Sequence, residues 1–210
     1  MTDVAHQPSL LDLAPEATLG PLTGRVSRQT LTAGAWVDHL PGWVRGSDSV
    51  LEHLLHEVDW RAERRRMYDG DVDVPRLLRW YGAREALPHP VLTEARRRLT
   101  EHYAAELGEP FTTAGMCLYR SGRDSVAWHG DTHGRSARQD TMVAIVSFGC
   151  PRPLLLRPRG GGDSLRFPLG HGDLIVMGGS CQRTWEHAIP KTARPVGPRV
   201  SVQFRPAGVA

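Results

Sequence analysis

The chain of 210 residues is long enough for one domain with a sizeable hydrophobic core. Its formal net charge of +3 is too small to indicate a nucleic-acid partner by itself. Three cysteines that lie far apart, with no Cys-x-x-Cys pair, argue against both a disulfide framework and a thiolate zinc site. The chain opens with no basic and apolar leader and contains no apolar run of membrane-spanning length. The cysteine usage fits a reducing cytosol, so we expect a cytoplasmic protein, and we expect it to be a monomer.

The basic residues are almost all arginines. Of the 26 lysines and arginines, only Lys191 is a lysine. One interpretation is codon bias in a GC-rich genome. The other is functional, because the planar guanidinium group makes bidentate contacts with phosphates and carboxylates.

The first 24 residues are rich in proline and glycine and predict a flexible N-terminal arm, followed by a single domain over residues 25–210. The segment Gln7–Leu11 (Gln-Pro-Ser-Leu-Leu) resembles the short peptides by which bacterial repair proteins hold the DNA sliding clamp. The alternative is a disordered tail with a minor apolar contact.

The N-terminal part of the domain mixes strands and helices. Loose alternation over residues 25–37 predicts an edge strand or two. An apolar stripe at helical spacing predicts a helix from Ser47 or Asp48 to Trp60. Apolar residues three or four apart predict a second helix over residues 90–107.

A basic and aromatic segment separates the two predicted helices. Residues 61–66 contain four arginines, which form either a solvated face or a surface for phosphates. Trp80 and Tyr81 are either core aromatics or part of a surface on which bases stack.

From residue 111 onward, short β-like segments follow one another at intervals of about ten residues. They are Ala114–Arg120, Val126–His129, Thr141–Phe148, Pro153–Arg157, Ser164–Pro168, Asp173–Met177, Gln182–His187 and Arg199–Arg205. This spacing predicts a mostly β (α+β) domain with a jelly-roll or cupin-like core, a double-stranded β-helix, flanked by N-terminal helices. The absence of βαβ alternation and of a phosphate loop argues against a nucleotide-binding sheet.

The motif Trp128-His129-Gly130-Asp131 places a histidine and a carboxylate two residues apart. On an extended backbone both side chains point to the same face. An imidazole and a carboxylate side by side are two thirds of a facial triad, which binds non-heme Fe(II) and leaves positions open for a co-substrate and oxygen.

The third ligand has three candidates, which are His133, His171 and His187. His133 lies too close along the chain and is expected at the mouth of the site. His171 lies between two glycines and is expected in a loop, held by hydrogen bonds. His187 ends a strand-like segment far along the chain, and a jelly roll brings such distant strand ends together, so we predict that His187 completes the triad.

The last predicted strand alternates strictly between polar and apolar residues. Its polar face carries Arg199, Ser201, Gln203 and Arg205. The simpler interpretation of this pattern is a half-exposed strand. Beside a His-x-Asp…His set, however, two arginines whose Cα atoms are roughly 20 Å apart can bracket a small dicarboxylate such as 2-oxoglutarate.

These residues together resemble the AlkB family of Fe(II)/2-oxoglutarate dioxygenases. The resemblance runs in order from about residue 30 to residue 206. The motifs that carry it are Cys117–Arg120, Trp128–Asp131, Gly170–Leu174, Trp185–His187 and Arg199–Arg205. It implies oxidative removal of alkyl groups from nucleic-acid bases, with Fe(II), 2-oxoglutarate and O2, and a substrate lid at about residues 61–90.

The resemblance also implies roles for individual residues. His129, Asp131 and His187 would bind iron. Tyr119 and Arg199 would hold the far carboxylate of 2-oxoglutarate, and Arg205 would lie near Asp131. Substrate contacts would come from Trp80 or Tyr81, Trp128, His133 and Arg135.

The chain departs from the family pattern at three positions. Cys117 and Ser201 each stand where many members have an asparagine near the co-substrate, and both are therefore assigned to the co-substrate site. His133 stands where an acidic residue often helps to select the base. The first two departures bear on 2-oxoglutarate binding, and the third bears on substrate preference.

A duplex base cannot reach a buried iron, so the implied activity needs a flipped base or a single strand. Candidate phosphate contacts are Arg135, Arg138, Arg157, Arg159 and Arg183. One alternative keeps the iron and 2-oxoglutarate but oxidises a protein side chain or a small molecule. Another is a jelly-roll binding module in which the triad holds a structural metal or none.

Overall fold

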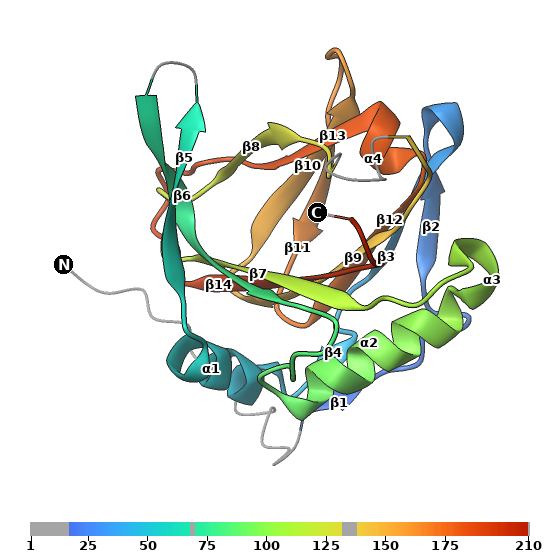
Figure 1. The fold of residues 1–210 in the computed structure, drawn as a ribbon, viewed down its shortest axis with the longest axis horizontal. Helices are drawn as coiled ribbons and strands as arrows, with labels where there is room; N and C mark the ends of the chain where they lie inside the picture. The colour runs from blue at the N-terminus through green and yellow to red at the C-terminus, as the bar shows by residue number, and fades with distance from the viewer. Residues whose placement is uncertain (1–16, 68–69, 132–137, 210) are drawn as a thin grey trace.

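Two antiparallel β-sheets face each other, and the two longest helices cover the outer face of the larger sheet (Figure 1). This arrangement comes from a computed structural model that describes residues 17–67, 70–131 and 138–209. None of the described helices is long and apolar enough to cross a membrane.

The larger sheet has eight strands. In spatial order they are β2 (Ser27–Thr30), β3 (Ala35–Leu40), β12 (Asp173–Gly179), β9 (Val143–Gly149), β14 (Arg199–Arg205), β7 (Thr113–Tyr119), β6 (Gly70–Tyr81) and β5 (Arg61–Met67). The smaller sheet consists of β11 (Leu165–Leu169), β10 (Arg152–Pro158), β13 (Trp185–Ile189) and β8 (Val126–His129). The prediction of a double-sheet jelly roll is confirmed, and the eight segments predicted after residue 111 correspond to β7–β14.

The helices also follow the predicted order. They are α1 (Ser47–Glu57), α2 (Pro90–His102), α3 (Ala104–Leu107) and α4 (Cys181–Thr184), with a short 3-10 turn, η1 (Thr32–Gly34). The helix predicted over residues 90–107 is divided at Tyr103 into α2 and α3. The segment predicted as one strand over residues 182–187 begins as α4 and becomes β13 only at Trp185.

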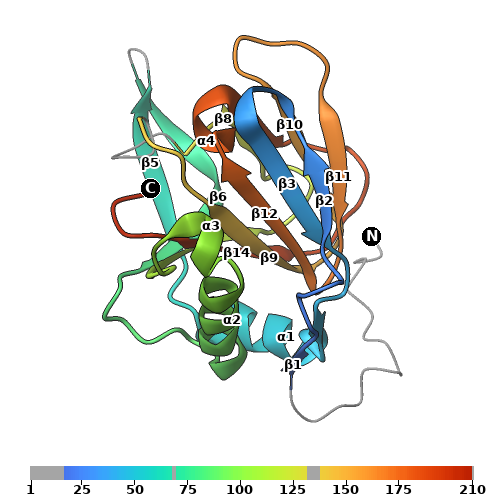
Figure 2. The same cartoon turned by 90° about the vertical axis from the view of Figure 1, so that its right-hand side faces the viewer.

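The main hydrophobic core lies between α1, α2 and the larger sheet (Figure 2). Leu54 of α1, Leu99 of α2 and Val202 of β14 are all fully buried in it. The alternating pattern of β14 explains this packing, because every second side chain points toward the helices. The other face of β14 points between the two sheets, where a second apolar cluster leaves room for a polar pocket.

The prediction of a flexible arm is wrong for residues 17–24. Strand β1 (Thr18–Leu19) pairs with β4 (Val44–Arg45) in a two-stranded sheet. Leu22 is buried in the main core, and Leu19 packs against it. Burial of two apolar side chains and the backbone pairing outweigh the turn-forming residues around them. Residues 1–16, including Gln7–Leu11, lie outside the described part of the chain.

The arginine-rich run at residues 61–66 forms β5, the edge strand of the larger sheet, and pairs with β6 in a long hairpin. The hairpin extends beyond the rest of the sheet (Figure 1). The sequence did not predict this strand because the segment has no apolar alternation. Basic side chains on an edge strand also discourage pairing with other chains.

Candidate active site

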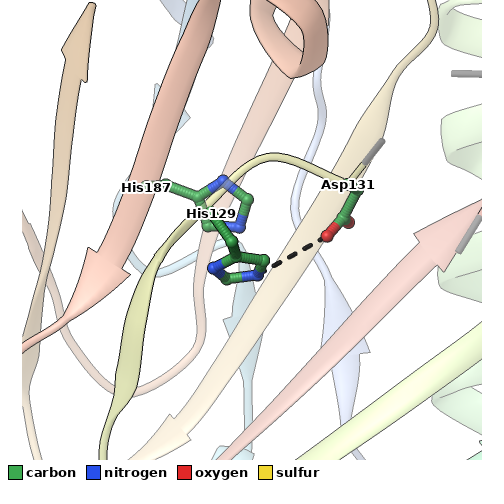
Figure 3. A group of neighbouring side chains, drawn as sticks. All are labelled: His129, Asp131 and His187. Carbon is green, nitrogen blue, oxygen red and sulfur yellow. Dashed lines mark ion pairs between the residues drawn. The ribbon is translucent and has the colours of Figure 1, made fainter. Parts of the chain in front are cut away.

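Three potential metal ligands meet where β8 and β13 lie side by side. His129 is the last residue of β8, and it is directly opposite His187 of β13 in the strand register. Asp131 follows two residues after His129 and faces both rings (Figure 3). The structure therefore brings together the two histidines and the carboxylate that the sequence selected.

The potential ligand atoms of these three residues all lie within 4.8 Å of one another. His129 Nε2 is 3.6 Å from Asp131 Oδ1, and the two imidazole centroids are 4.2 Å apart. His129 Nδ1 is 2.8 Å from the carbonyl oxygen of Ala127. That contact fixes the proton on Nδ1 and leaves Nε2 free for a metal.

The protonation states also suit a metal. Burial lowers the pKa of His187 to about 3, with a further contribution from His129, so its imidazole is neutral at physiological pH. Burial would raise the pKa of Asp131, but Arg205 and the two imidazoles outweigh it and hold this pKa well below its usual range. Neutral imidazole and ionised carboxylate are the forms that bind metal ions.

The set of donors discriminates between types of metal site. Among the described residues the cluster contains two imidazoles and one carboxylate, and no cysteine. Structural zinc sites usually use four protein ligands, often including thiolates. Two histidines and one carboxylate on one side of an ion suit non-heme Fe(II) with open positions.

Asp131 has a second partner on the opposite sheet. Arg205, at the end of β14, donates from Nε to Asp131 Oδ2 at 2.9 Å, and its Nη2 lies 2.7 Å from the same oxygen. The carboxylate is 5% exposed, so the pair is largely shielded from water. This pair fixes one oxygen of Asp131 and leaves the other directed toward the histidines.

At the other end of β14, Arg199 lies beside Tyr119 of β7. Arg199 is 1% exposed, which excludes a half-exposed strand. Its Nε donates to Ser147 Oγ at 2.9 Å, but its buried Nη1 has no hydrogen-bond partner among the described residues. Burial raises the pKa of Tyr119 to about 12, so its hydroxyl stays protonated and can donate. An unpaired buried guanidinium nitrogen is costly and suits an anionic ligand.

A polar row, formed by Cys117, Ser201 and Gln203, lies between Arg199 and Arg205 on the inner face of the larger sheet. Cys117 is directly opposite Ser201 in the β7–β14 register. Gln203 Nε2 donates to the Ser201 hydroxyl, and Cys117 Sγ lies 3.9 Å from Gln203 Oε1. The two positions at which the chain departs from the family pattern are thus joined through Gln203.

The three potential ligands, the two arginines, Tyr119 and the polar row line one recess between the sheets. Its empty volume of about 470 Å³ includes open solvent at the mouth. Its apolar wall is formed by Val126, Ile145, Leu154 and Ile189. The recess also contains Arg76 of β6, which donates to the Ser125 carbonyl at 3.1 Å and has a buried Nε with no hydrogen-bond partner among the residues that the structure describes. The sequence reasoning missed Arg76. The sequence did contain an indication of Arg76, because Arg76 and Trp80 are an even number of residues apart and therefore lie on the same face of the strand.

The structure distinguishes the two aromatic candidates on β6. Trp80 is 42% exposed, and its ring lies 5.8 Å from the guanidinium of Arg205. Tyr81 points to the opposite face and is buried in the main core. Trp80 is therefore beside the mouth of the recess, whereas Tyr81 is a core residue.

Other predicted substrate contacts lie elsewhere. Trp128 packs under the guanidinium of Arg157 at 4.2 Å and does not line the recess. Arg157 is opposite Glu186 in the strand register, so this contact lies on the outer face of the smaller sheet. The prediction that Trp128 lines the substrate mouth is therefore wrong, because adjacent strand residues point to opposite faces. His133 and Arg135 lie outside the described residues.

The candidate phosphate contacts differ in how they are already engaged. Arg157 is paired with Glu186, and Arg183 with Asp140. Arg159 donates to the carbonyl of Arg183 at 2.9 Å. Arg138 is exposed.

His171, another of the three histidines predicted as possible third ligands, instead accepts a hydrogen bond from the Gly149 amide at 2.7 Å.

Comparison with known proteins identifies this architecture. Residues 40–205 match the family model described as the 2OG-Fe(II) oxygenase superfamily. The human alpha-ketoglutarate-dependent dioxygenase alkB homolog 3 is 34% identical, over 96% of this chain and 73% of the relative. The human DNA oxidative demethylase ALKBH2 is 30% identical, over 76% of this chain and 68% of the relative. The match to the bovine alkB homolog 3 spans 64% of that relative's length.

Solved structures show the same fold at lower sequence identity. A structure titled "The structure of OsALKBH1" superposes with a TM-score of 0.60 at 15% identity, covering 86% of this chain and all of the other. A 2OG-Fe(II) oxygenase family oxidoreductase from Burkholderia pseudomallei gives a TM-score of 0.57 at 12% identity, covering 83% of this chain and 87% of the other.

Proposed function

The chain belongs to the AlkB family of the 2OG-Fe(II) oxygenase superfamily, and from this premise we propose that it removes alkyl groups from the bases of nucleic acids. It is a dioxygenase that requires Fe(II), 2-oxoglutarate and O2. The observation that carries the choice of substrate is Trp80, an exposed indole at the mouth of the recess, beside the Arg205–Asp131 pair. A flat aromatic surface at this place suits a stacked base.

In the proposed site, His129, Asp131 and His187 would hold the iron. With 2-oxoglutarate and O2 it would supply oxidation of the alkyl carbon, with succinate and CO2 as by-products and an aldehyde released from the base. The 37% exposure of the His129 side chain places it where a substrate can approach.

Arg199 and Tyr119 are the proposed partners of the distal carboxylate of 2-oxoglutarate. The unpaired Nη1 of Arg199 and the protonated hydroxyl of Tyr119 both offer donors in a site shielded from water. Arg76 adds a second cation at the same recess. Cys117 and Ser201 line the recess between the two arginines, so we assign them to the wall of the co-substrate site.

Arg205 has a different proposed role, because its guanidinium is already committed to Asp131. It keeps the carboxylate ionised and oriented toward the two histidines. The apolar wall formed by Val126, Ile145 and Leu154 excludes water from the neighbouring co-substrate.

The test is release of formaldehyde from methylated single-stranded DNA, duplex DNA, RNA, peptide and free small molecules, each with Fe(II) and 2-oxoglutarate. We expect turnover of one or more nucleic acids. Turnover confined to a peptide or a small molecule would support the alternative substrate class and reject our proposal. The same assay identifies the preferred strand form.

Trp80 provides a more specific test of the substrate surface. We expect Trp80→Ala to raise the KM for the nucleic acid by about tenfold, since loss of base stacking costs roughly 1–3 kcal/mol. The KM for 2-oxoglutarate should stay constant. Trp36→Ala, which removes a half-buried indole that does not line the recess, is the matched control.

We also propose a sliding-clamp contact through Gln7–Leu11 and a cytoplasmic location. Because Thr18–Leu19 pairs with the domain, a truncation should end at residue 16. Loss of clamp capture by the truncated chain and by Leu10→Ala would support the contact. Unchanged capture would reject it.

A further inference from the structure

The short helix α4 directly precedes the strand that carries His187, and it contacts the segment that carries His129 and Asp131. It spans Cys181–Thr184, and β13 with His187 begins directly after it. Gln182, in the middle of the helix, is 1% exposed. A buried carboxamide costs free energy unless its polar atoms are hydrogen-bonded.

The Gln182 side chain contacts the other ligand segment. The backbone N–H of Asp131 donates to Gln182 Oε1 at 2.9 Å, across 51 residues of sequence. On the other side, Gln182 Nε2 lies 4.0 Å from Met177 Sδ. Because the Asp131 amide can only donate, the oxygen of the carboxamide must face it.

The backbone of the ligand segment also lies directly against α4. A Cβ added at Gly130 would come within 2.4 Å of the Gln182 carbonyl oxygen and 3.2 Å of the Trp185 carbonyl oxygen. A glycine between the two ligands His129 and Asp131 is therefore needed for this close approach.

Helix α4 is in turn held by the rest of the domain. Arg159 donates to the carbonyl of Arg183 at 2.9 Å and to that of Gln182 at 3.4 Å. Ser180 Oγ donates to the Ala33 carbonyl at 2.6 Å. These contacts fix α4 relative to both sheets, so the hydrogen bond that the Asp131 amide donates to Gln182 holds the Asp131 backbone against a rigid support.

We propose that Gln182 is a positioning residue of the metal site, which sets the distance between Asp131 and His187 before the metal binds. Its oxygen holds the backbone of Asp131, and its own segment continues into the strand of His187. Gln182 acts on the metal site, so this role does not depend on the nucleic-acid substrate.

Substitution with methionine separates this role from simple packing. Gln182→Met keeps the length of the side chain and loses the acceptor for the Asp131 amide. We expect about a tenfold weaker affinity for Co(II) and Fe(II), the lower end of the effect of removing an outer partner of a metal ligand. Gln182→Glu keeps an oxygen at the same position and should bind metal more tightly than Gln182→Met. Met177→Leu, which changes the other contact of Gln182, is the matched control and should leave the affinity unchanged.

The measurement is an anaerobic titration of the metal-free full-length protein with Co(II) and with Fe(II), followed by visible absorption, with no nucleic acid present. Thermal unfolding of the metal-free proteins measures the folded fraction. Gly130→Ala breaks the same contact from the other side and should also weaken binding, which keeps the test decisive if Gln182→Met is unstable. The proposal is rejected if Gln182→Met or Gly130→Ala binds metal as tightly as wild type. Equal losses in Gln182→Met and Met177→Leu would also reject it.

Discussion

The two sheets contribute opposite kinds of chemistry to one recess. The smaller sheet supplies His129 and His187, and their separation is set by backbone pairing between β8 and β13. The larger sheet supplies Arg199 and Arg205, whose charges are buried between the sheets. The metal end is thus defined by strand register. The proposed co-substrate end is defined by Arg199, a buried cation whose Nη1 has no hydrogen-bond partner in the described part of the chain.

This difference predicts that substitutions in the two sheets have different effects on metal binding and on 2-oxoglutarate binding. Loss of a ligand on the smaller sheet should remove metal binding and, with it, 2-oxoglutarate binding. Loss of a cation on the larger sheet should remove 2-oxoglutarate binding and leave the metal. The Arg205–Asp131 pair connects the two ends.

The largest effect is expected for His187→Ala. One of three ligands is lost, so Fe(II) affinity should fall by more than the roughly 10–100-fold that follows loss of an outer partner. Turnover of 2-oxoglutarate should disappear. Anaerobic Fe(II) titration and succinate formation measure the two effects, and a variant that still forms succinate would show that His187 is not a ligand.

A smaller but selective effect is expected for Arg199→Ala. Truncating one partner of a buried charge pair costs about 2–5 kcal/mol, so the KM for 2-oxoglutarate should rise by at least about thirtyfold. Metal affinity measured without 2-oxoglutarate should not change. Arg199→Lys should be intermediate, because an ammonium cannot make a bidentate contact.

The control for this change is Arg166→Ala, which removes an exposed arginine from the smaller sheet. A rise in KM for both variants would indicate a general charge effect. An unchanged KM for 2-oxoglutarate in Arg199→Ala would contradict the proposed role of the larger sheet.

Many of the residues that the two sheets contribute to the recess could be predicted from the sequence. The His-x-Asp spacing selected two ligands and the alternation of residues 199–205 selected both arginines, because both depend on the two-residue period of a strand. The third ligand, His187, was selected because it ends a strand-like segment far along the chain. The same period, applied to Trp128 and His129, would have placed Trp128 on the outer face. That error came from grouping neighbours by sequence position and not by face.

Other features depend on contacts that no local pattern encodes. Strand β5 has four arginines and no apolar alternation, so only its pairing with β6 makes it a strand. The assignment of Trp80 to the mouth and Tyr81 to the core follows from the register of β6 with β7. Gln182 meets Asp131 only because the fold brings together residues 51 positions apart.

A third prediction concerns the connection between the two ends. Gly115 of β7 lies beneath the Arg205 side chain, and a Cβ there would come within 2.8 Å of Arg205 Nη1 and 3.1 Å of Gln203 Oε1. Gly115→Ala should displace Arg205 from Asp131 and cost about 1 kcal/mol, or roughly fivefold in catalytic efficiency for 2-oxoglutarate. Gly82→Ala, where an added Cβ meets open space, is the matched control. Equal kinetics for the two variants would show that Arg205 can move without functional cost.

The smallest effect on activity is expected from a carboxylate that does not line the recess. Asp173, at the start of β12, accepts hydrogen bonds from the Gly42 amide at 2.7 Å and the Gly170 amide at 2.6 Å. Burial would raise its pKa, but His39 and these two amides outweigh burial and lower it below 3.8. The ionised form therefore stabilises the fold above pH 4, and this stabilisation is lost as the pH falls through the lowered pKa.

We expect Asp173→Asn to reduce the free energy of unfolding at pH 7 by about 2 kcal/mol, because the buried amides lose a charged acceptor. The difference from wild type should shrink as the pH falls below about 4. Urea unfolding as a function of pH measures this difference, and 2-oxoglutarate kinetics at pH 7 should be unchanged. A constant difference at all pH values would mean that packing, and not the charge, stabilises this corner of the larger sheet. Altered kinetics would mean that the stability of the larger sheet and the geometry of its cation site cannot be separated.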